Sequence, residues 1–211
     1  MNIGLRFATS EPIYGSAMSN ATLERDQTTS NTSGTTDVDS GTFHETEAGI
    51  RTLMRDSSTS IPLADRVEMV ALLNQLLADT IDLRVQIKQA HWNVRGIHFQ
   101  ALHELFDDVA EPLPAFTDDL AERAGTLGGA AIGSVTEVAK TTRLDAMPNA
   151  FLDGESALHA VKERLAFVAN EMRKGVDSAA EFGDEITADV LTEITRGLDQ
   201  QLWFVESHLD G

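Results

Sequence analysis

Apolar residues recur at steps of three and four along four long stretches of this chain, the spacing that is typical of amphipathic α-helices. The four predicted helices follow Pro62, Gly96, Asp153 and Gly183. The first begins near Asp65, whose side chain we expect to cap it. No stretch alternates with the period of two that indicates a half-buried strand. The pattern therefore predicts an all-α fold, a four-helix bundle with one long crossover.

The first predicted helix is apolar over more than half of its circumference. This suits burial against both its own bundle and a partner. A narrower face carries polar side chains that we expect to lie in water. It consists of Glu68, Gln75, Asp79, Asp82 and Gln86.

The second predicted helix carries Pro112 and Pro114 near its middle. An interior proline removes a backbone hydrogen bond and kinks a helix. Because the apolar stripe keeps its phase across both prolines, we expect one bent helix that Gly128 and Gly129 end. The segment from Ser134 to Glu137 has the form of a capping box, which predicts a short helix within the crossover.

Composition divides the chain near residue 60. Residues 1–60 are rich in Ser, Thr, Asp and Gly and have no sustained period, so we expect a polar, largely disordered extension. We expect residues 61–211 to form the folded domain. Met18 is an alternative start of the chain, and no segment is apolar enough for a secretory signal or a membrane span.

The charge of the chain restricts its partners. The formal net charge is −18, and residues 61–211 alone hold 12 basic and 26 acidic residues. Such a surface repels nucleic acid and phospholipid head groups and attracts cations. The chain has no cysteine, which excludes disulfides and thiolate metal sites.

The second predicted helix also carries a polar stripe of potential metal ligands. His103 and Asp107 are four residues apart and share a face, as do Asp118 and Glu122. Eleven residues separate Asp107 from Asp118, close to three helical turns, so all four side chains lie along one stripe. This stripe lies roughly 150° from the apolar one, and it therefore faces water or another chain.

One copy of this helix cannot close both pairs around one ion. Asp107 and Asp118 are separated by roughly 16 Å along the axis, whereas metal–ligand bonds are only about 2 Å long. Two antiparallel copies about a two-fold axis would bring His103 and Asp107 of one chain to Asp118 and Glu122 of the other, making two sites. We therefore expect metal binding between subunits.

Several motifs resemble the Dps family of ferritin-like mini-ferritins. They are KQAHWNVRG, FQALHELFD, DDLAERAGTLGG, TADVLTEI and LDQQLWFVESHL, within residues 61–211. The resemblance implies a ferritin-like four-helix bundle with a short helix in its crossover, assembled as a hollow dodecamer. It also implies a ferroxidase that oxidises Fe(II), preferably with hydrogen peroxide, and stores Fe(III) as mineral. The implied location is the cytoplasm, with association with the nucleoid as a further expectation.

The resemblance assigns particular residues. His91, His103, Asp107, Asp118 and Glu122 fall at the spacings of that family's ferroxidase ligands, with Asp107 and Glu122 as its principal carboxylates. Trp92, beside His91, shields the site, supplies electrons or simply packs at the interface. The family's iron-entry pore maps onto an acidic run that would equally complement a helix dipole. It comprises Asp184, Glu185, Asp189 and Glu193.

Two alternatives remain. A di-iron protein of the ordinary ferritin type would place Glu-x-x-His pairs inside one bundle, and this chain has no such pair. A DNA-compacting structural protein is the second alternative. The acidic body and tail make direct, tight DNA binding unexpected, although divalent cations would allow bridging. We expect His44, His159 and His208 to be surface residues, and we leave His98 unassigned.

Overall fold

The structure is a computed structural model that describes residues 41–209. The alternative start at Met18 and most of the predicted extension lie outside these residues. Six helices are present in this range: α1 (Leu63–Asn93), α2 (Phe99–Ala110), α3 (Leu113–Thr126), α4 (Val135–Thr141), α5 (Gly154–Glu181) and α6 (Glu185–Glu206). Four short strands accompany them: β1 (Thr42–Glu45), β2 (Arg51–Met54), β3 (Val94–Arg95) and β4 (Leu152–Asp153).

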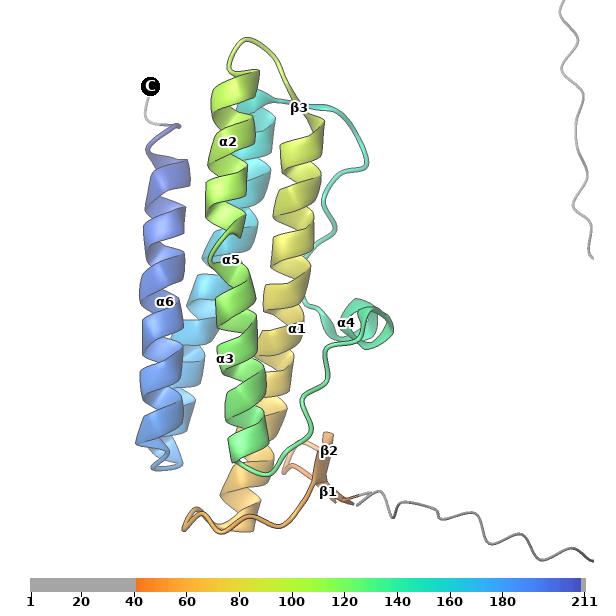
Figure 1. The fold of residues 1–211 in the computed structure, drawn as a ribbon, viewed down its shortest axis with the longest axis vertical. Coiled ribbons are helices and arrows are strands. Elements are labelled where there is room, and N and C mark those ends of the chain that lie inside the picture. The colour runs from red at the N-terminus through yellow and green to blue at the C-terminus, as the bar shows by residue number, and fades with distance from the viewer. Residues whose placement is uncertain (1–40, 210–211) are drawn as a thin grey trace, which may run out of the picture. The chain divides into compact units, whose positions relative to one another are not determined.

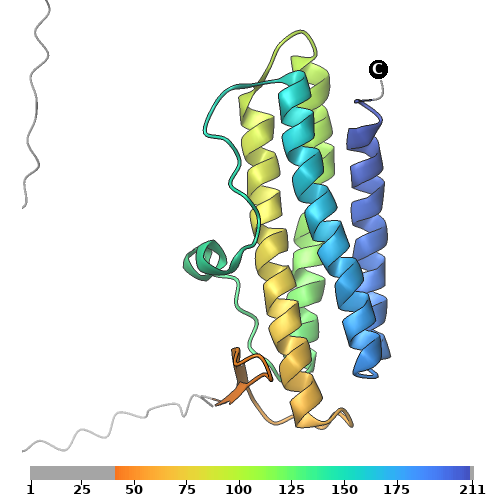
Figure 2. The ribbon, with the colours of Figure 1, turned by 180° about the vertical axis from the view of Figure 1, so that it is seen from behind.

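The long helices form the predicted bundle. Figure 1 shows α1, α5, α6 and the α2–α3 pair running side by side, and Figure 2 shows the same arrangement from behind. The apolar stripes meet in one core, in which Leu73, Phe106, Leu165 and Leu198 are fully buried. The prediction of a helical bundle with a short helix in the crossover is confirmed. Among the described helices, none has the length and apolar character needed to cross a membrane.

The structure divides the expected single bent helix into α2 and α3. Glu111 and Pro112 lie between them and keep right-handed helical backbone angles, so the two helices continue in nearly one line. A proline nitrogen carries no hydrogen to donate, so Pro112 and Pro114 interrupt the hydrogen-bond ladder here. The apolar stripe nevertheless keeps its phase, because Phe106, Val109, Leu113 and Leu120 remain buried.

Side-chain caps begin three of the helices. Ser134 accepts a hydrogen bond from the backbone N–H of Glu137, which confirms the predicted capping box of α4. Asp153 caps α5 and Asp184 caps α6 in the same way. The prediction for α1 was wrong: this helix begins at Leu63, two residues before Asp65, and has no side-chain cap.

An antiparallel hairpin precedes α1, within the segment expected to be a disordered extension. Strands β1 and β2 pair with Thr42 opposite Met54. The hairpin is joined to the turn after α3, because Ala130 donates its backbone N–H to the carbonyl oxygen of Leu53 at 2.9 Å. Met54 is buried in the core. The folded unit therefore begins before residue 61, and each strand is too short to show a period of two convincingly.

The crossover between α3 and α5 covers the polar face of α1 (Figures 1 and 2). Asp79 and Gln86, predicted to face water, are 0% and 6% exposed. Arg143 of the crossover binds the Asp79 carboxylate at 2.6 Å, and Arg164 of α5 donates to the Gln86 side-chain oxygen at 2.6 Å. Buried polar groups need such partners, and the partners come from segments far away in the sequence.

Candidate metal centre

His91 and His103 form the centre of the site. His91, near the end of α1, is 6% exposed, and His103 lies one turn into α2. Their rings stack with centroids 3.6 Å apart. Nδ1 of His91 lies 2.6 Å from the backbone oxygen of His103, and Nδ1 of His103 lies 2.9 Å from the backbone oxygen of His91.

This reciprocal arrangement selects one tautomer. A carbonyl oxygen can only accept a hydrogen bond, so both Nδ1 atoms carry the proton. A neutral imidazole then keeps its lone pair on Nε2, the atom left free to bind a metal ion. Backbone carbonyls that hold Nδ1 also fix the orientation of metal-binding histidines in many proteins. The pair is therefore arranged as two metal ligands would be.

Asp107 lies one turn after His103 on α2, with its side chain 51% exposed. Its carboxylate oxygen is 3.7 Å from Nδ1 of His91 and forms an ion pair with Lys88 of α1. The hydrogen bond from Lys88 lowers the pKa of Asp107 most strongly, burial raises this pKa, and the charges of His91, Lys88 and His103 lower it further. The carboxylate therefore stays ionised and available to a cation.

Sequence reasoning missed Lys88. Its position three residues before His91 places it on the same face of α1, which is the signal that would have identified it. The same Asp107 carboxylate that could bind a cation is thus paired with the ammonium group of Lys88.

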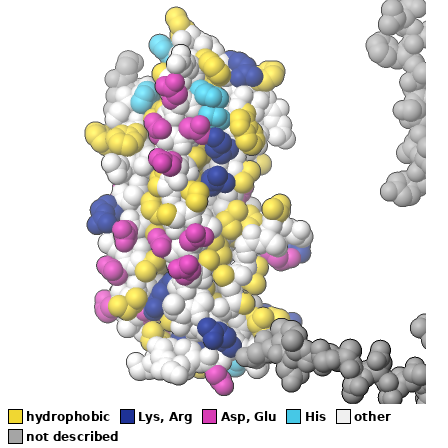
Figure 3. Space-filling view, viewed as in Figure 1, with side chains coloured by type: hydrophobic (Ala, Val, Ile, Leu, Met, Phe, Trp, Pro, Cys, Tyr) yellow, Lys and Arg dark blue, Asp and Glu magenta, His cyan; other side chains and the backbone are white. Residues whose placement is uncertain are grey.

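Asp118 and Glu122 lie on α3, four residues apart and both exposed. Figure 3 shows acidic side chains along the face formed by α2 and α3, with histidines gathered near the start of α2. In residues 41–209, no three His, Asp or Glu side chains are close enough together to hold a metal ion. The structure places His91, His103 and Asp107 near one another without bringing all three close enough to share one ion, and the two carboxylates of α3 belong to no such group.

Trp92 is 59% exposed although its neighbour His91 is buried. Consecutive residues on a helix point about 100° apart, so burial of one agrees with exposure of the other. Trp92 therefore presents a large aromatic side chain at the surface beside the histidine pair.

The acidic run at the start of α6 separates into two parts. The carboxylate of Asp184 is buried, caps α6 through the N–H of Thr187, and accepts a hydrogen bond from Arg123 of α3 at 2.7 Å. Burial raises its pKa, but the hydrogen bonds from Thr187 and Arg123 outweigh this effect, and the net pKa is lowered. The other three carboxylates are exposed: Glu185, Asp189 and Glu193.

Fold and sequence together define the class of the protein. The profile of the Ferritin-like domain family matches residues 70–211, which is more than half of the chain. This range includes most of α1, all of the later helices and every residue of the candidate centre.

Individual relatives make the family more specific. The DNA protection during starvation protein of Agrobacterium fabrum is 41% identical over 153 residues, covering 72% of this chain and 94% of that protein. DpsC from Streptomyces coelicolor superposes with a TM-score of 0.71 at 32% identity, over 75% of this chain and 92% of that one. Dps from Mycobacterium smegmatis gives a TM-score of 0.71 at 25% identity, over 75% and 96%. The chain belongs to the Dps family.

Proposed function

We propose that this protein is a ferroxidase that takes Fe(II) as its substrate at sites shared between two subunits. Each site would combine His91, His103 and Asp107 of one chain with Asp118 and Glu122 of its two-fold partner. Stored Fe(III) mineral would fill a hollow homododecamer, as the family implies. By removing Fe(II) and peroxide together, the protein would protect DNA in the cytoplasm from oxidative damage.

The observation that carries this proposal is the reciprocal hydrogen bonding of His91 and His103 beside an ionised Asp107. Two free Nε2 atoms and a carboxylate are suitable ligands for a borderline divalent ion such as Fe(II). The absence of cysteine also suits turnover with peroxide, because no thiolate ligand can be oxidised.

The redox step balances with iron and peroxide alone. Each of two Fe(II) ions gives one electron to hydrogen peroxide, its O–O bond breaks, and protons convert the two oxygens to water. Hydrolysis of the two Fe(III) ions then releases protons as the mineral forms. In this scheme the protein binds and orients Fe(II), and its histidines and carboxylates are not themselves oxidised.

The acidic surface would supply the substrate. A net charge of −18 raises the local concentration of cations. We assign Glu185, Asp189 and Glu193 to an iron-entry pore, because they are exposed and recur every four residues on α6. Asp184 belongs to the run in sequence, but its capping and pairing with Arg123 favour a structural role.

Formation of the ferric charge-transfer band after adding Fe(II) and peroxide tests this function. We expect rapid oxidation by the wild type and slow oxidation by the His103→Ala/Asp107→Ala double variant. Each rate is compared with the rate at which the same mixture of Fe(II) and peroxide reacts without protein. Equal rates for the two proteins would refute the assignment of ligands.

A further inference from the structure

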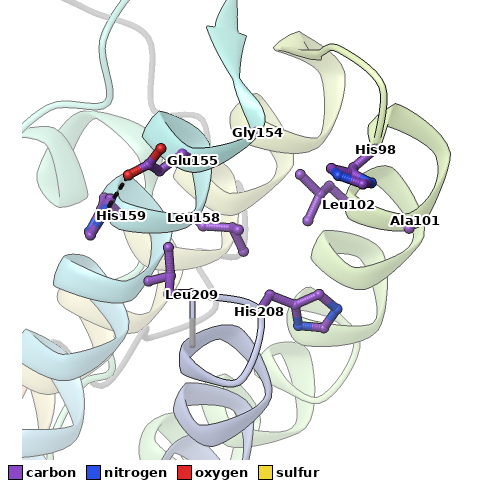
Figure 4. A pocket seen from close by; sticks show the side chains of 9 residues that line it. All are labelled: His98, Ala101, Leu102, Gly154, Glu155, Leu158, His159, His208 and Leu209. Carbon is purple, nitrogen blue, oxygen red and sulfur yellow. Dashed lines mark ion pairs between the residues drawn. The ribbon is translucent and has the colours of Figure 1, made fainter. Parts of the chain in front are cut away.

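A cavity of about 440 Å³ lies at the end of the bundle where α2 and α5 begin and α6 ends (Figure 4). Three of the six histidines of the chain line it: His98, His159 and His208. None of them belongs to the proposed iron site, and the proposed function gives this cavity no role. Its volume falls within the roughly 300–1,000 Å³ that is typical of small-molecule sites.

The middle of the cavity is apolar. Leu102 and Leu158 are 3% and 5% exposed, and Leu209 is partly buried beside them. The helices α2 and α5 come close together at the base, because a Cβ atom on Gly154 would lie 2.8 Å from the Leu102 side chain. This wall suits a compact apolar body such as an aromatic ring.

Polar groups lie on opposite sides of these leucines. Figure 4 shows Glu155 and His159 on one side of Leu158 and Leu209, and His98 and His208 on the other. Within residues 41–209 no three His, Asp or Glu side chains are close enough to share a metal ion. The arrangement therefore favours an organic molecule that spans the cavity over a single metal ion.

One polar group on each side, His208 and Glu155, can accept a hydrogen bond. His208 donates from Nδ1 to the backbone oxygen of Phe204 at 2.7 Å, which leaves the lone pair on Nε2. On the other side, a carboxylate oxygen of Glu155 lies 4.0 Å from Nε2 of His159, too far for a hydrogen bond. The Glu155 side chain is 82% exposed, so its carboxylate can meet an incoming donor.

We propose that this cavity binds a small hydroxyaromatic amine. Its ring packs against Leu102 and Leu158, its hydroxyl donates to Nε2 of His208, and its ammonium group lies beside Glu155. The net charge of −18 also favours a cation over an anion of the same shape.

Calorimetric titration of the full-length protein with tyramine tests this proposal. The matched anion is 4-hydroxyphenylpropionate, which keeps the hydroxyphenyl ring and replaces the ammonium group with a carboxylate. We expect tyramine to bind at least tenfold more tightly than the anion. Failure of tyramine to bind, or equal binding of both compounds, overturns the proposal.

Two variants locate the bound compound. Ala101 is exposed and lines the cavity, so Ala101→Trp should fill it and weaken tyramine binding at least tenfold. Glu155→Gln should weaken binding about threefold, since an exposed ion pair contributes little. Glu163→Gln is the matched control, because it removes the same charge from an exposed position on α5 away from the cavity.

Far-ultraviolet circular dichroism establishes that each variant is folded before titration. Unchanged affinity in folded Ala101→Trp overturns the proposal, whatever the iron chemistry of the protein. An equal loss of affinity in Glu155→Gln and Glu163→Gln also overturns it, because attraction to the overall charge would then explain the binding.

Discussion

His91 and His103 each hydrogen-bond through Nδ1 to the backbone oxygen of the other, at 2.6 and 2.9 Å. This contact joins the end of α1 to the first turn of α2, across the loop that contains Gly96. It fixes both tautomers and leaves both Nε2 atoms free. These two hydrogen bonds thus hold the ends of α1 and α2 together and leave two imidazole nitrogens available as ligands.

Loss of one imidazole should slow iron oxidation. In His103→Ala, the site loses a ligand and His91 loses the imidazole that stacks on its ring, although the backbone oxygen that accepts from its Nδ1 remains. We expect the initial rate of Fe(II) oxidation to fall at least about tenfold, by analogy with the cost of losing groups that orient metal ligands. His44→Ala provides the control, because His44 lies in β1 outside the candidate centre. A similar loss in both variants would contradict a specific role for His103.

The ion pair between Arg143 and Asp79 should contribute strongly to stability. Asp79 is 0% exposed, so Arg143→Met leaves a buried carboxylate without its cation. We expect a loss of about 3 kcal/mol in the free energy of unfolding, measured by urea denaturation. In Asp79→Asn/Arg143→Met neither charge remains, so part of this loss should be recovered.

Arg173→Met provides the matched control for Arg143→Met. It breaks the pair between Arg173 and Asp199, whose side chains are 51% and 47% exposed. Exposed pairs contribute about 0–1 kcal/mol, so this variant should change stability little. Equal losses in Arg143→Met and Arg173→Met would show that burial of Asp79 does not determine the effect.

Asp184 should make stability depend on pH. Its pKa in the folded protein is lowered from the ordinary value of 3.8, so folding favours the ionised form. The resulting stabilisation is fully present above the unfolded-state pKa and is lost as the pH falls through the folded-state pKa. Asp184→Asn should therefore cost about 2 kcal/mol at neutral pH and much less well below pH 3.8.

Urea denaturation of both proteins over this pH range measures the difference. Glu185→Asn is the neighbouring control, because that side chain is exposed. The free energy of unfolding of Glu185→Asn should stay close to that of the wild type at every pH. A gap between wild type and Asp184→Asn that keeps its size at acid pH would contradict the assigned role of the carboxylate.

Direct binding to DNA should be absent or weak. Duplex DNA and a chain of net charge −18 repel each other, and repulsion lowers affinity most at low salt. We expect no gel shift in the presence of a chelator. A shift that requires Mg²⁺ would indicate bridging by divalent cations, whereas a shift in chelator would contradict the electrostatic argument.

Periodicity alone predicted the long helices because their apolar stripes are extended and regular. The cap Ser134 was also recognisable, since it acts on a residue only three positions away. The outward stripe of His103, Asp107, Asp118 and Glu122 followed from helical spacing in the same way.

Contacts between distant segments could not be predicted. Asp79 looked like a solvent-exposed residue because nothing near it in sequence indicates that Arg143 binds it from 64 positions away. The hairpin of residues 42–54 was missed because strands of four residues give too little pattern. The division of α2 from α3 depends on hydrogen bonds at Pro112 and Pro114, to which the phase of the apolar stripe is insensitive.

Mixing two inactive variants tests the shared site most directly. One is His103→Ala/Asp107→Ala, and the other is Asp118→Ala/Glu122→Ala. Each alone lacks half of every site. When the two chains are co-expressed and assemble at random, half of the two-fold pairs are mixed, and each mixed pair rebuilds one of its two sites.

About one quarter of all sites should then be intact, as two-fold symmetry requires. We predict that the mixed assembly oxidises Fe(II) with peroxide at about one quarter of the wild-type rate, far above either variant alone. A mixed assembly no faster than the average of the two variants would contradict the central claim that the site is built from two chains.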